Sequence, residues 1–147
     1  DLDEKRLEAD CRFAEDPCQV RADSGRIEEV VINLLDNAIK FTGEEGKIIL
    51  ETAAQGERVA VTIWDSGIAV PPEDRDRIFD RFFTADRAHT AGKGTGLGLS
   101  ICQRIMEMHG QQLELLSAEE TEAYGEAEGG GAAFRFTLAA EPERKAG

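Results

Sequence analysis

Four polar residues in the segment RIEEVVINLLDNAIKFT recur at steps of four, four and three: Glu29, Asn33, Asn37 and Lys40. On a helix these steps place the four side chains on one face, about one turn apart. Carboxylate and amide oxygens suit a hard cation such as Mg²⁺, which keeps waters and substrate phosphates in its coordination shell, and a lysine can contact those phosphates. This face could therefore hold a metal ion with phosphate, although a polar face that only contacts solvent is the alternative.

The same segment has a second, apolar stripe, which predicts a helix from Arg26 to Thr42 that packs on a sheet. Asp23 or Ser24 can cap its start, and Gly43 is typical of a helix end. The apolar positions recur at intervals of three and four residues, at Ile27, Val30, Val31, Leu34, Leu35, Ala38 and Phe41.

Strands are predicted on both sides of this helix in the sequence. The residues before it favour two short strands around the Asp16-Pro17 turn. After it, Lys47 to Ala53 and Arg58 to Trp64 are rich in Ile, Val, Leu and Thr, and residues 55–57 between them suit a hairpin turn. The hairpin leads into Asp65-Ser66-Gly67, where a carboxylate ends a strand and a glycine lets the backbone turn closely.

Two further helices are predicted in the second half of the chain. Pro71-Pro72-Glu73-Asp74 is typical of a helix start, and its helix would bury Ile78, Phe79, Phe82 and Phe83. The polar stretch Thr84 to Lys93 is expected to be a mobile loop. It meets a glycine-rich run, Gly94 to Ser100, that opens a helix ending at His109. Such a helix start points free backbone N–H groups and a partial positive charge outward, which suits phosphate.

Two final strands are predicted from alternation, one through Leu113 and Leu115 and one through Phe134 to Leu138. Between them, residues 118–131 are acidic and contain glycines, so we expect an exposed, poorly ordered loop insert there. Residues 141–147 are expected to be a disordered tail. Residues 1–140 would then form one domain.

Composition excludes several classes of function. The net charge of −13 argues against a nucleic-acid surface, which relies on clustered Lys and Arg. No run reaches membrane-spanning length. The three cysteines lack CxxC spacing, which favours reduced thiols in a cytosolic domain over a zinc site. The first residue is Asp1 rather than Met, so we expect a fragment of a longer protein, with membrane anchoring of that parent left open.

Four motifs occur in the order NLLDNAIKFT, DSG, RIFDRFF and GKGTGLGLSI. A Walker or Rossmann interpretation of the glycines fails, because no strand directly precedes them and no Gly-Lys-Ser/Thr follows. In this order the motifs resemble the N, G1, F and G2 boxes of bacterial sensor histidine kinases, over about Val20 to Leu138. The resemblance implies a catalytic and ATP-binding domain with the Bergerat fold of gyrase-type ATPases. That fold is an α/β (α+β) two-layer sandwich, with a mixed, mostly antiparallel sheet of about five strands and three helices on one face.

The resemblance also implies a role for individual residues. Asn37 would be the main Mg²⁺ ligand, assisted by Asn33, and Lys40 would contact the phosphates of ATP. Asp65 would accept a hydrogen bond from the adenine amino group, and Gly67 would let the backbone approach the base. Further nucleotide contacts would come from Ala69, Ile78, Phe79, Arg81, Arg87, Lys93, Gly94, Thr95, Gly96, Leu97 and Gly98.

Three positions modify this expectation. ATP-hydrolysing members of the superfamily carry a glutamate where this chain has Asn33, which cannot take a proton from water, so hydrolysis should be slow. Ala69 replaces a usual glycine, and a positive φ there would cost roughly 1 kcal/mol. Ala132 replaces a usual Ser or Thr whose hydroxyl supports the adenine end.

The implied activity is transfer of the γ-phosphoryl group of Mg-ATP to a histidine on an absent dimerisation domain. The implied partners are that domain and the receiver domain of a response regulator, with a monomeric isolated domain and a homodimeric parent. His89 and His109 are expected to be in solvent or in structural hydrogen bonds. Two alternatives stay open: a pseudokinase interaction module, motivated by Ala69, and a serine kinase or switch protein of the same superfamily.

Overall fold

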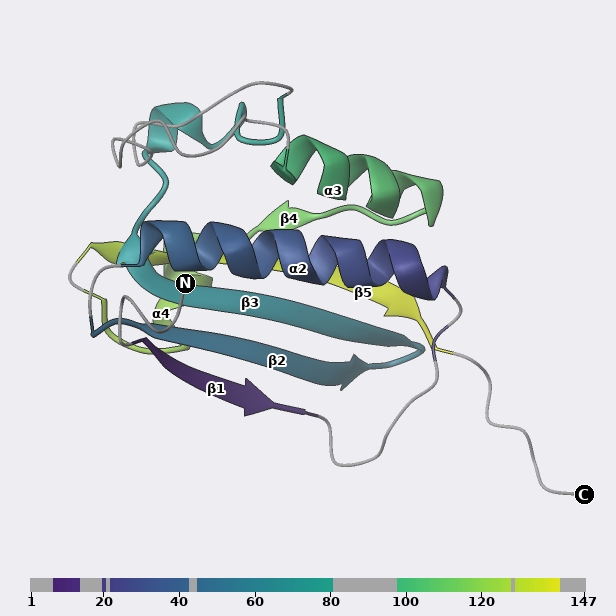
Figure 1. The fold of residues 1–147 in the computed structure, drawn as a ribbon, viewed down its shortest axis with the longest axis horizontal. Coiled ribbons are helices and arrows are strands. Elements are labelled where there is room, and N and C mark those ends of the chain that lie inside the picture. The colour runs from purple at the N-terminus through teal and green to yellow at the C-terminus, as the bar shows by residue number, and fades with distance from the viewer. Residues whose placement is uncertain are drawn as a thin grey trace, which may run out of the picture.

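The computed structural model describes residues 7–13, 20, 22–42, 45–80, 98–127 and 129–140. Its centre is a five-stranded sheet in the order β1-β2-β3-β5-β4, formed by β1 (Glu8–Arg12), β2 (Lys47–Gln55), β3 (Arg58–Ile68), β4 (Glu114–Leu115) and β5 (Gly130–Ala139). β1 pairs parallel with β2, and the other pairs are antiparallel. The predicted mixed sheet and its central hairpin are therefore confirmed (Figure 1).

The predicted first helix is α2 (Ser24–Phe41), which lies across one face of the sheet. The Asp23 side chain caps it by accepting a hydrogen bond from the Arg26 N–H at 3.1 Å. It ends at Thr42, where the backbone becomes extended. Its buried residues Val30, Leu34 and Ala38 follow the predicted apolar stripe, so the hydrophobic period sets which face contacts the sheet.

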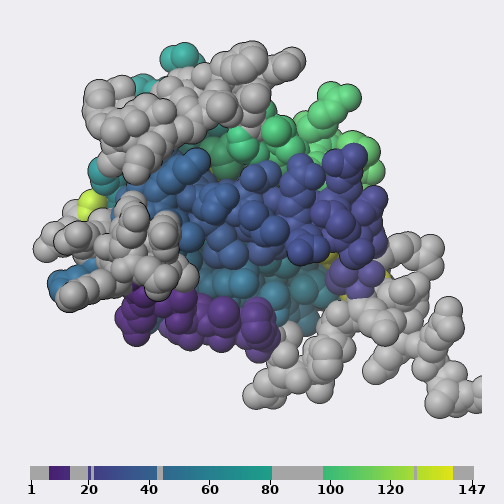
Figure 2. All heavy atoms as spheres, in the orientation of Figure 1, coloured from purple at the N-terminus to yellow at the C-terminus, as the bar shows by residue number. Residues whose placement is uncertain are grey.

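The second long helix, α3 (Gly98–Met108), lies beside α2 on the same face of the sheet. Figure 2 shows the side chains of α2 crossing the middle of this face, with α3 along one side. His109 joins the end of α3 to the start of α2. Its Nε2 accepts from the Asp23 N–H at 3.0 Å, and its Nδ1 lies 2.8 Å from the Ile105 carbonyl oxygen. The two helices therefore run antiparallel, and His109 has the structural role expected for it.

The sheet has a core on each face because successive strand residues point to opposite sides. The larger core fills the space between the sheet and the two long helices and includes Ile48, Ile63 and Phe134. The smaller core contains their neighbours in sequence, Ile49, Trp64 and Ala133, together with Leu116. Trp64 is thus a sheet-packing residue.

The segment after Pro71 differs from prediction. It forms a short 3₁₀ helix, η1 (Pro72–Asp74), followed by turns, rather than a longer helix. The pattern of burial still holds for the described residues, because Ile78 is buried and the Phe79 and Phe134 rings pack edge to face with centroids 6.1 Å apart. Phe82 and Phe83 lie outside the described residues.

The prediction of a poorly ordered loop over residues 118–131 is wrong at both ends of this range. Ala118–Glu122 forms the helix α4, and Gly130 and Gly131 belong to β5. A capping box starts α4: the Ser117 hydroxyl accepts from the Glu120 N–H, and the Glu120 carboxylate accepts from the Ser117 N–H, each at 3.1 Å. The residues just after α4 pack on the smaller core, so this segment covers the sheet face opposite α2.

The N-terminal strands are only partly as expected. β1 forms, but Val20 makes an isolated antiparallel bridge to Ala140 instead of pairing with β1. The turn predicted at Asp16-Pro17 and the tail at 141–147 lie outside the described residues. Within the described chain, no helix has the length and apolar character needed to cross a bilayer.

Candidate functional site

The polar face of α2 has the side chains that the sequence placed on it. Glu29, Asn33 and Asn37 are half-buried, and Lys40 is exposed. Glu29 lies 3.4 Å from the Arg26 guanidinium in a partly exposed pair, which contributes little to stability. The two amides therefore remain the central groups of the face, one turn apart.

Cys102 brings the first turns of α3 against this face. Its side chain is fully buried, and its Sγ lies 3.8 Å from the Val30 carbonyl oxygen of α2. Burial raises the pKa of the Cys102 thiol to about 12, against the opposing effect of a hydrogen bond with the Asn33 side chain. Cys102 is thus a neutral packing residue that places α3, just after its start at Gly98, beside Asn33.

The end of β3 presents Asp65 through a break in strand pairing. The β3–β5 register shifts between Asp65 and Ile68, so the chain bulges at Ser66 and Gly67. Bulges often redirect side chains near binding sites. Asp65 is only 2% exposed, and its Oδ1 accepts from the Gly67 N–H at 2.9 Å. The bulge therefore holds a buried carboxylate at a fixed place beside the helix layer.

Gly67 is needed for a reason that the sequence did not show. A Cβ at this position would lie 2.1 Å from the Phe41 carbonyl oxygen at the end of α2. Real Cβ atoms do not approach oxygen so closely, so only glycine fits. The structure shows a close approach to the α2 backbone, which joins the end of α2 to the Asp65 bulge. The predicted approach to a base stays a prediction.

Ala69 carries no backbone strain. Among the described residues, Glu45 is the one non-glycine residue with a positive φ, so the cost anticipated for Ala69 does not arise. Its N–H donates to the Gly129 carbonyl at 2.7 Å. The positive φ of +94° belongs instead to Gly130, where a Cβ would meet the Ala69 Cβ at 2.9 Å. Ala132 is buried in β5, opposite Asp65.

Three groups missed by sequence reasoning also shape the site. They are the Phe41 carbonyl, the Ser66 hydroxyl, which accepts from the Lys47 N–H at 2.8 Å, and the glycines of residues 129–131. The run of three glycines was the one available signal for close backbone packing. Several predicted contacts lie outside the described residues: Arg81, Arg87, Lys93, Gly94, Thr95, Gly96 and Leu97.

The described residues thus unite the amide face of α2, the buried carboxylate of β3 and the first turns of α3. The histidine kinase-, DNA gyrase B- and HSP90-like ATPase family matches residues 22–142. The chain belongs to this family. The adaptive-response sensory kinase SasA of Trichormus variabilis is 42% identical to it over 127 residues, which are 86% of this chain and 29% of that protein.

Solved structures place this ATPase-family chain among the catalytic domains of histidine kinases. A mycobacterial sensor histidine kinase, MprB, superimposes with a TM-score of 0.82 at 28% identity, covering 97% of this chain and 90% of that one. Full-length ShkA in complex with AMPPNP gives a TM-score of 0.75 at 31% identity, covering 95% of this chain and 27% of that one. The chain is therefore an ATP-binding catalytic module of sensor histidine kinase type.

The chain spans 12% of the length of the sensor protein KdpD of Escherichia coli, to which it is 35% identical over 119 residues, and 29% of the length of that SasA protein. The resemblance seen in the four sequence motifs and the expected α+β fold with a five-stranded mixed sheet are thus confirmed. The helices differ from the expectation in one respect: α2 and α3 lie on one face of the sheet, and α4 lies on the other. The role of each site residue stays a prediction.

Proposed function

We propose that this domain binds Mg-ATP between α2, the Asp65 bulge and the start of α3, and supplies the γ-phosphoryl group to a histidine on a dimerisation domain of its parent protein. The supporting observation is that two separate segments contact α2: Gly67 of the β3 bulge lies against Phe41 at its end, and Cys102 of α3 lies against its turn at Val30, next to Asn33. The carboxylate of the bulge and the first turns of α3 are thus both packed on the helix that carries the two amides.

The residues present fit a nucleotide and a hard cation. Asp65 is buried and can accept a hydrogen bond from an adenine amino group. Asn37, with Asn33 one turn earlier, offers amide oxygens of the type that Mg²⁺ binds, and Mg²⁺ would neutralise phosphate charge. Lys40 is exposed at the same end of α2 and would contact phosphate.

Asn33 also argues for a kinase over a hydrolase. An amide cannot accept a proton from water, so Asn33 cannot act as a general base. Glu29 is the other candidate base among the described residues of this α2 face, and it pairs with Arg26. Slow hydrolysis preserves the phosphoryl group for a histidine nucleophile. Catalysis would then consist mainly of positioning and charge neutralisation.

The partners follow from the same proposal. They are the phosphoacceptor domain of the parent protein and the receiver domain of a response regulator. We expect the parent to be a homodimer in which this domain lies in the cytoplasm. Alone, this domain should bind nucleotide as a monomer and phosphorylate nothing. The pseudokinase alternative loses its motivation, because Ala69 has no positive φ. The serine kinase or switch protein remains distinguishable by a phosphorylation assay with the complete parent.

Calorimetric titration with ADP and Mg²⁺ tests the proposal. We expect saturable binding that weakens when Mg²⁺ is removed, and at least about tenfold weaker binding for Asn37→Ala, because a metal ligand is lost. Asp36→Ala is the matched control, since Asp36 is the exposed neighbour of Asn37 on the same helix and lies off the amide face. Absence of binding by the unaltered domain, or equal losses in both variants, would refute the assignment.

A further inference from the structure

The segment from Ser117 to Gly131 reaches the proposed base-binding end of the site. Its Gly129 carbonyl accepts from the Ala69 N–H at 2.7 Å. A Cβ at Gly129 would lie 3.0 Å from the Gly67 carbonyl oxygen, and one at Gly131 would lie 2.9 Å from the Asp65 carbonyl oxygen. The segment therefore packs backbone against backbone on the turn that holds Asp65, with no room for side chains between them.

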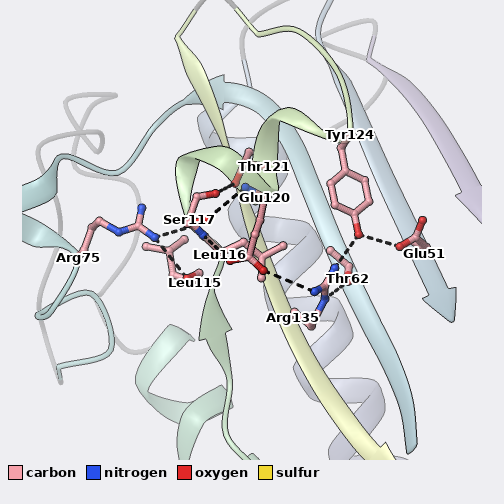
Figure 3. A network of polar contacts seen from close by, with 10 residues as sticks. All are labelled: Glu51, Thr62, Arg75, Leu115, Leu116, Ser117, Glu120, Thr121, Tyr124 and Arg135. Atoms are coloured by element: carbon pink, nitrogen blue, oxygen red, sulfur yellow. Dashed lines mark hydrogen bonds and ion pairs between the residues drawn. The ribbon is translucent and has the colours of Figure 1, made fainter. Parts of the chain in front are cut away.

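The middle of the segment is attached to the opposite face of the sheet by a polar network (Figure 3). Tyr124 donates its hydroxyl hydrogen to Glu51 of β2 at 2.7 Å and accepts from Arg135 of β5 at 2.9 Å. Arg135 also donates to the Thr62 hydroxyl of β3 at 2.9 Å. One tyrosine hydroxyl thus ties the segment to three neighbouring strands through charged partners, which make the stronger hydrogen bonds.

Arg75 holds the start of the segment, and a local hydrogen bond stabilises its first turn. The Arg75 guanidinium, just after η1, donates to the Leu116 carbonyl at 2.6 Å and to the Leu115 carbonyl at 3.3 Å. The Thr121 hydroxyl donates to the Ser117 carbonyl at 2.8 Å inside α4. Beneath the segment lies Trp64, and a Cβ at Gly125 would meet its ring at 3.4 Å. The described part of the segment is therefore attached at its start, at Tyr124 and at the glycines beside the Asp65 turn.

We propose that Tyr124 and Arg135 are positioning residues for adenine recognition. They hold residues 117–131 against the Asp65–Ala69 turn and so keep the Asp65 carboxylate in the orientation that accepts the adenine amino group. This inference rests on the proposed nucleotide function. Neither residue touches the nucleotide, because both lie on the sheet face opposite α2.

The arrangement predicts a selective effect. The metal and phosphate groups are on α2, whereas the network acts on the base end of the site alone. Tyr124→Phe keeps the ring that packs on the smaller core and removes the hydroxyl. We expect ADP affinity to fall roughly threefold to tenfold, as one hydrogen bond of the network is lost. Binding of inosine diphosphate, which lacks the amino group, should change by less than about twofold.

The experiment measures the affinity of the full chain for ADP and for inosine diphosphate in the presence of Mg²⁺. The affinity of the weaker ligand is obtained from its competition with the stronger one. Arg58→Ala is the control, because Arg58 lies on the same sheet face and hydrogen-bonds Gln111 and Thr137 but not the 117–131 segment. Trp64, the single tryptophan, reports on the segment by fluorescence. Arg135→Lys keeps the charge but cannot bridge Thr62 and Tyr124, so it should resemble Tyr124→Phe.

Selective loss of ADP binding in Tyr124→Phe, with a Trp64 signal change and no such loss in Arg58→Ala, supports the inference. Equal losses for both ligands, or no loss for either, overturn it while nucleotide binding by the unaltered chain stands. If the unaltered chain binds no ADP, the proposed function itself fails, and the inference fails with it.

Discussion

Gly67 lies where the β3 bulge packs directly against the backbone at the end of α2, with no space for a side chain. A Cβ added at Gly67 would lie only 2.1 Å from the Phe41 carbonyl oxygen, so this carbonyl would have to move. The carbonyl belongs to backbone at the end of α2 and cannot rotate away as a side chain could. The same contact places the end of α2 beside the turn that holds Asp65, so the absence of a side chain at Gly67 matters both for stability and for the site.

We therefore expect Gly67→Ala to destabilise the domain by roughly 2–4 kcal/mol and to weaken ADP binding. Urea unfolding monitored by Trp64 fluorescence measures the first effect and calorimetry the second. Gly25→Ala provides the comparison, because Gly25 is in the first turn of α2 and its Cβ would make only an ordinary contact, 3.6 Å from Asp23. A Gly67→Ala variant as stable as Gly25→Ala would contradict the close approach.

At the scale of elements, α2 and α3 pack through a thiol that must stay protonated. Burial raises the pKa of Cys102 from 9.0 to about 12, and the Glu29 carboxylate adds to this rise while the Asn33 hydrogen bond opposes it. The unfolded chain loses this proton at lower pH than the folded chain does. The stabilisation is thus complete below about pH 9 and is lost as the pH rises towards about 12.

The expected result is that the free energy of unfolding falls by about 1 kcal/mol per pH unit above pH 9 because of this group. Urea unfolding at about pH 8 and about pH 10 measures the slope. Cys102→Ala should be less stable at both values, since it leaves a small cavity, but its stability should fall less steeply with pH. Equal slopes for the two proteins would show that Cys102 ionises as freely when folded as when unfolded.

At the scale of the whole molecule, the sequence predicted what depends on local pattern. The 18 residues of α2 have both a regular apolar stripe and a capping aspartate, and the β2–β3 hairpin has strong strand formers around a turn. The amide face and the Asp65 turn were predictable because their motifs are continuous in sequence. Family likeness then supplied the order of the elements.

What the sequence analysis missed depends on contacts between distant segments. α4 is acidic and has little apolar content, so composition indicated a loop, although the Ser117–Glu120 capping box was present in the sequence as a signal. The partner of Gly67 is a backbone carbonyl 26 positions earlier in the sequence, and the partners of Tyr124 are on β2 and β5. Neither contact leaves a local pattern.

The hydrogen bond between His109 and Asp23 has a consequence for how the two helix layers respond to ligand. It links α3 to α2 at the end remote from the Asp65 bulge, so we expect this end of α3 to stay in place when ligand binds and any movement to be larger at Gly98. Amide chemical shift changes on adding ADP should then be largest near Gly98 and decrease steadily towards Met108. Chemical shift changes of equal size along α3 would mean that the hydrogen bond between His109 and Asp23 does not hold this end of the helix in place.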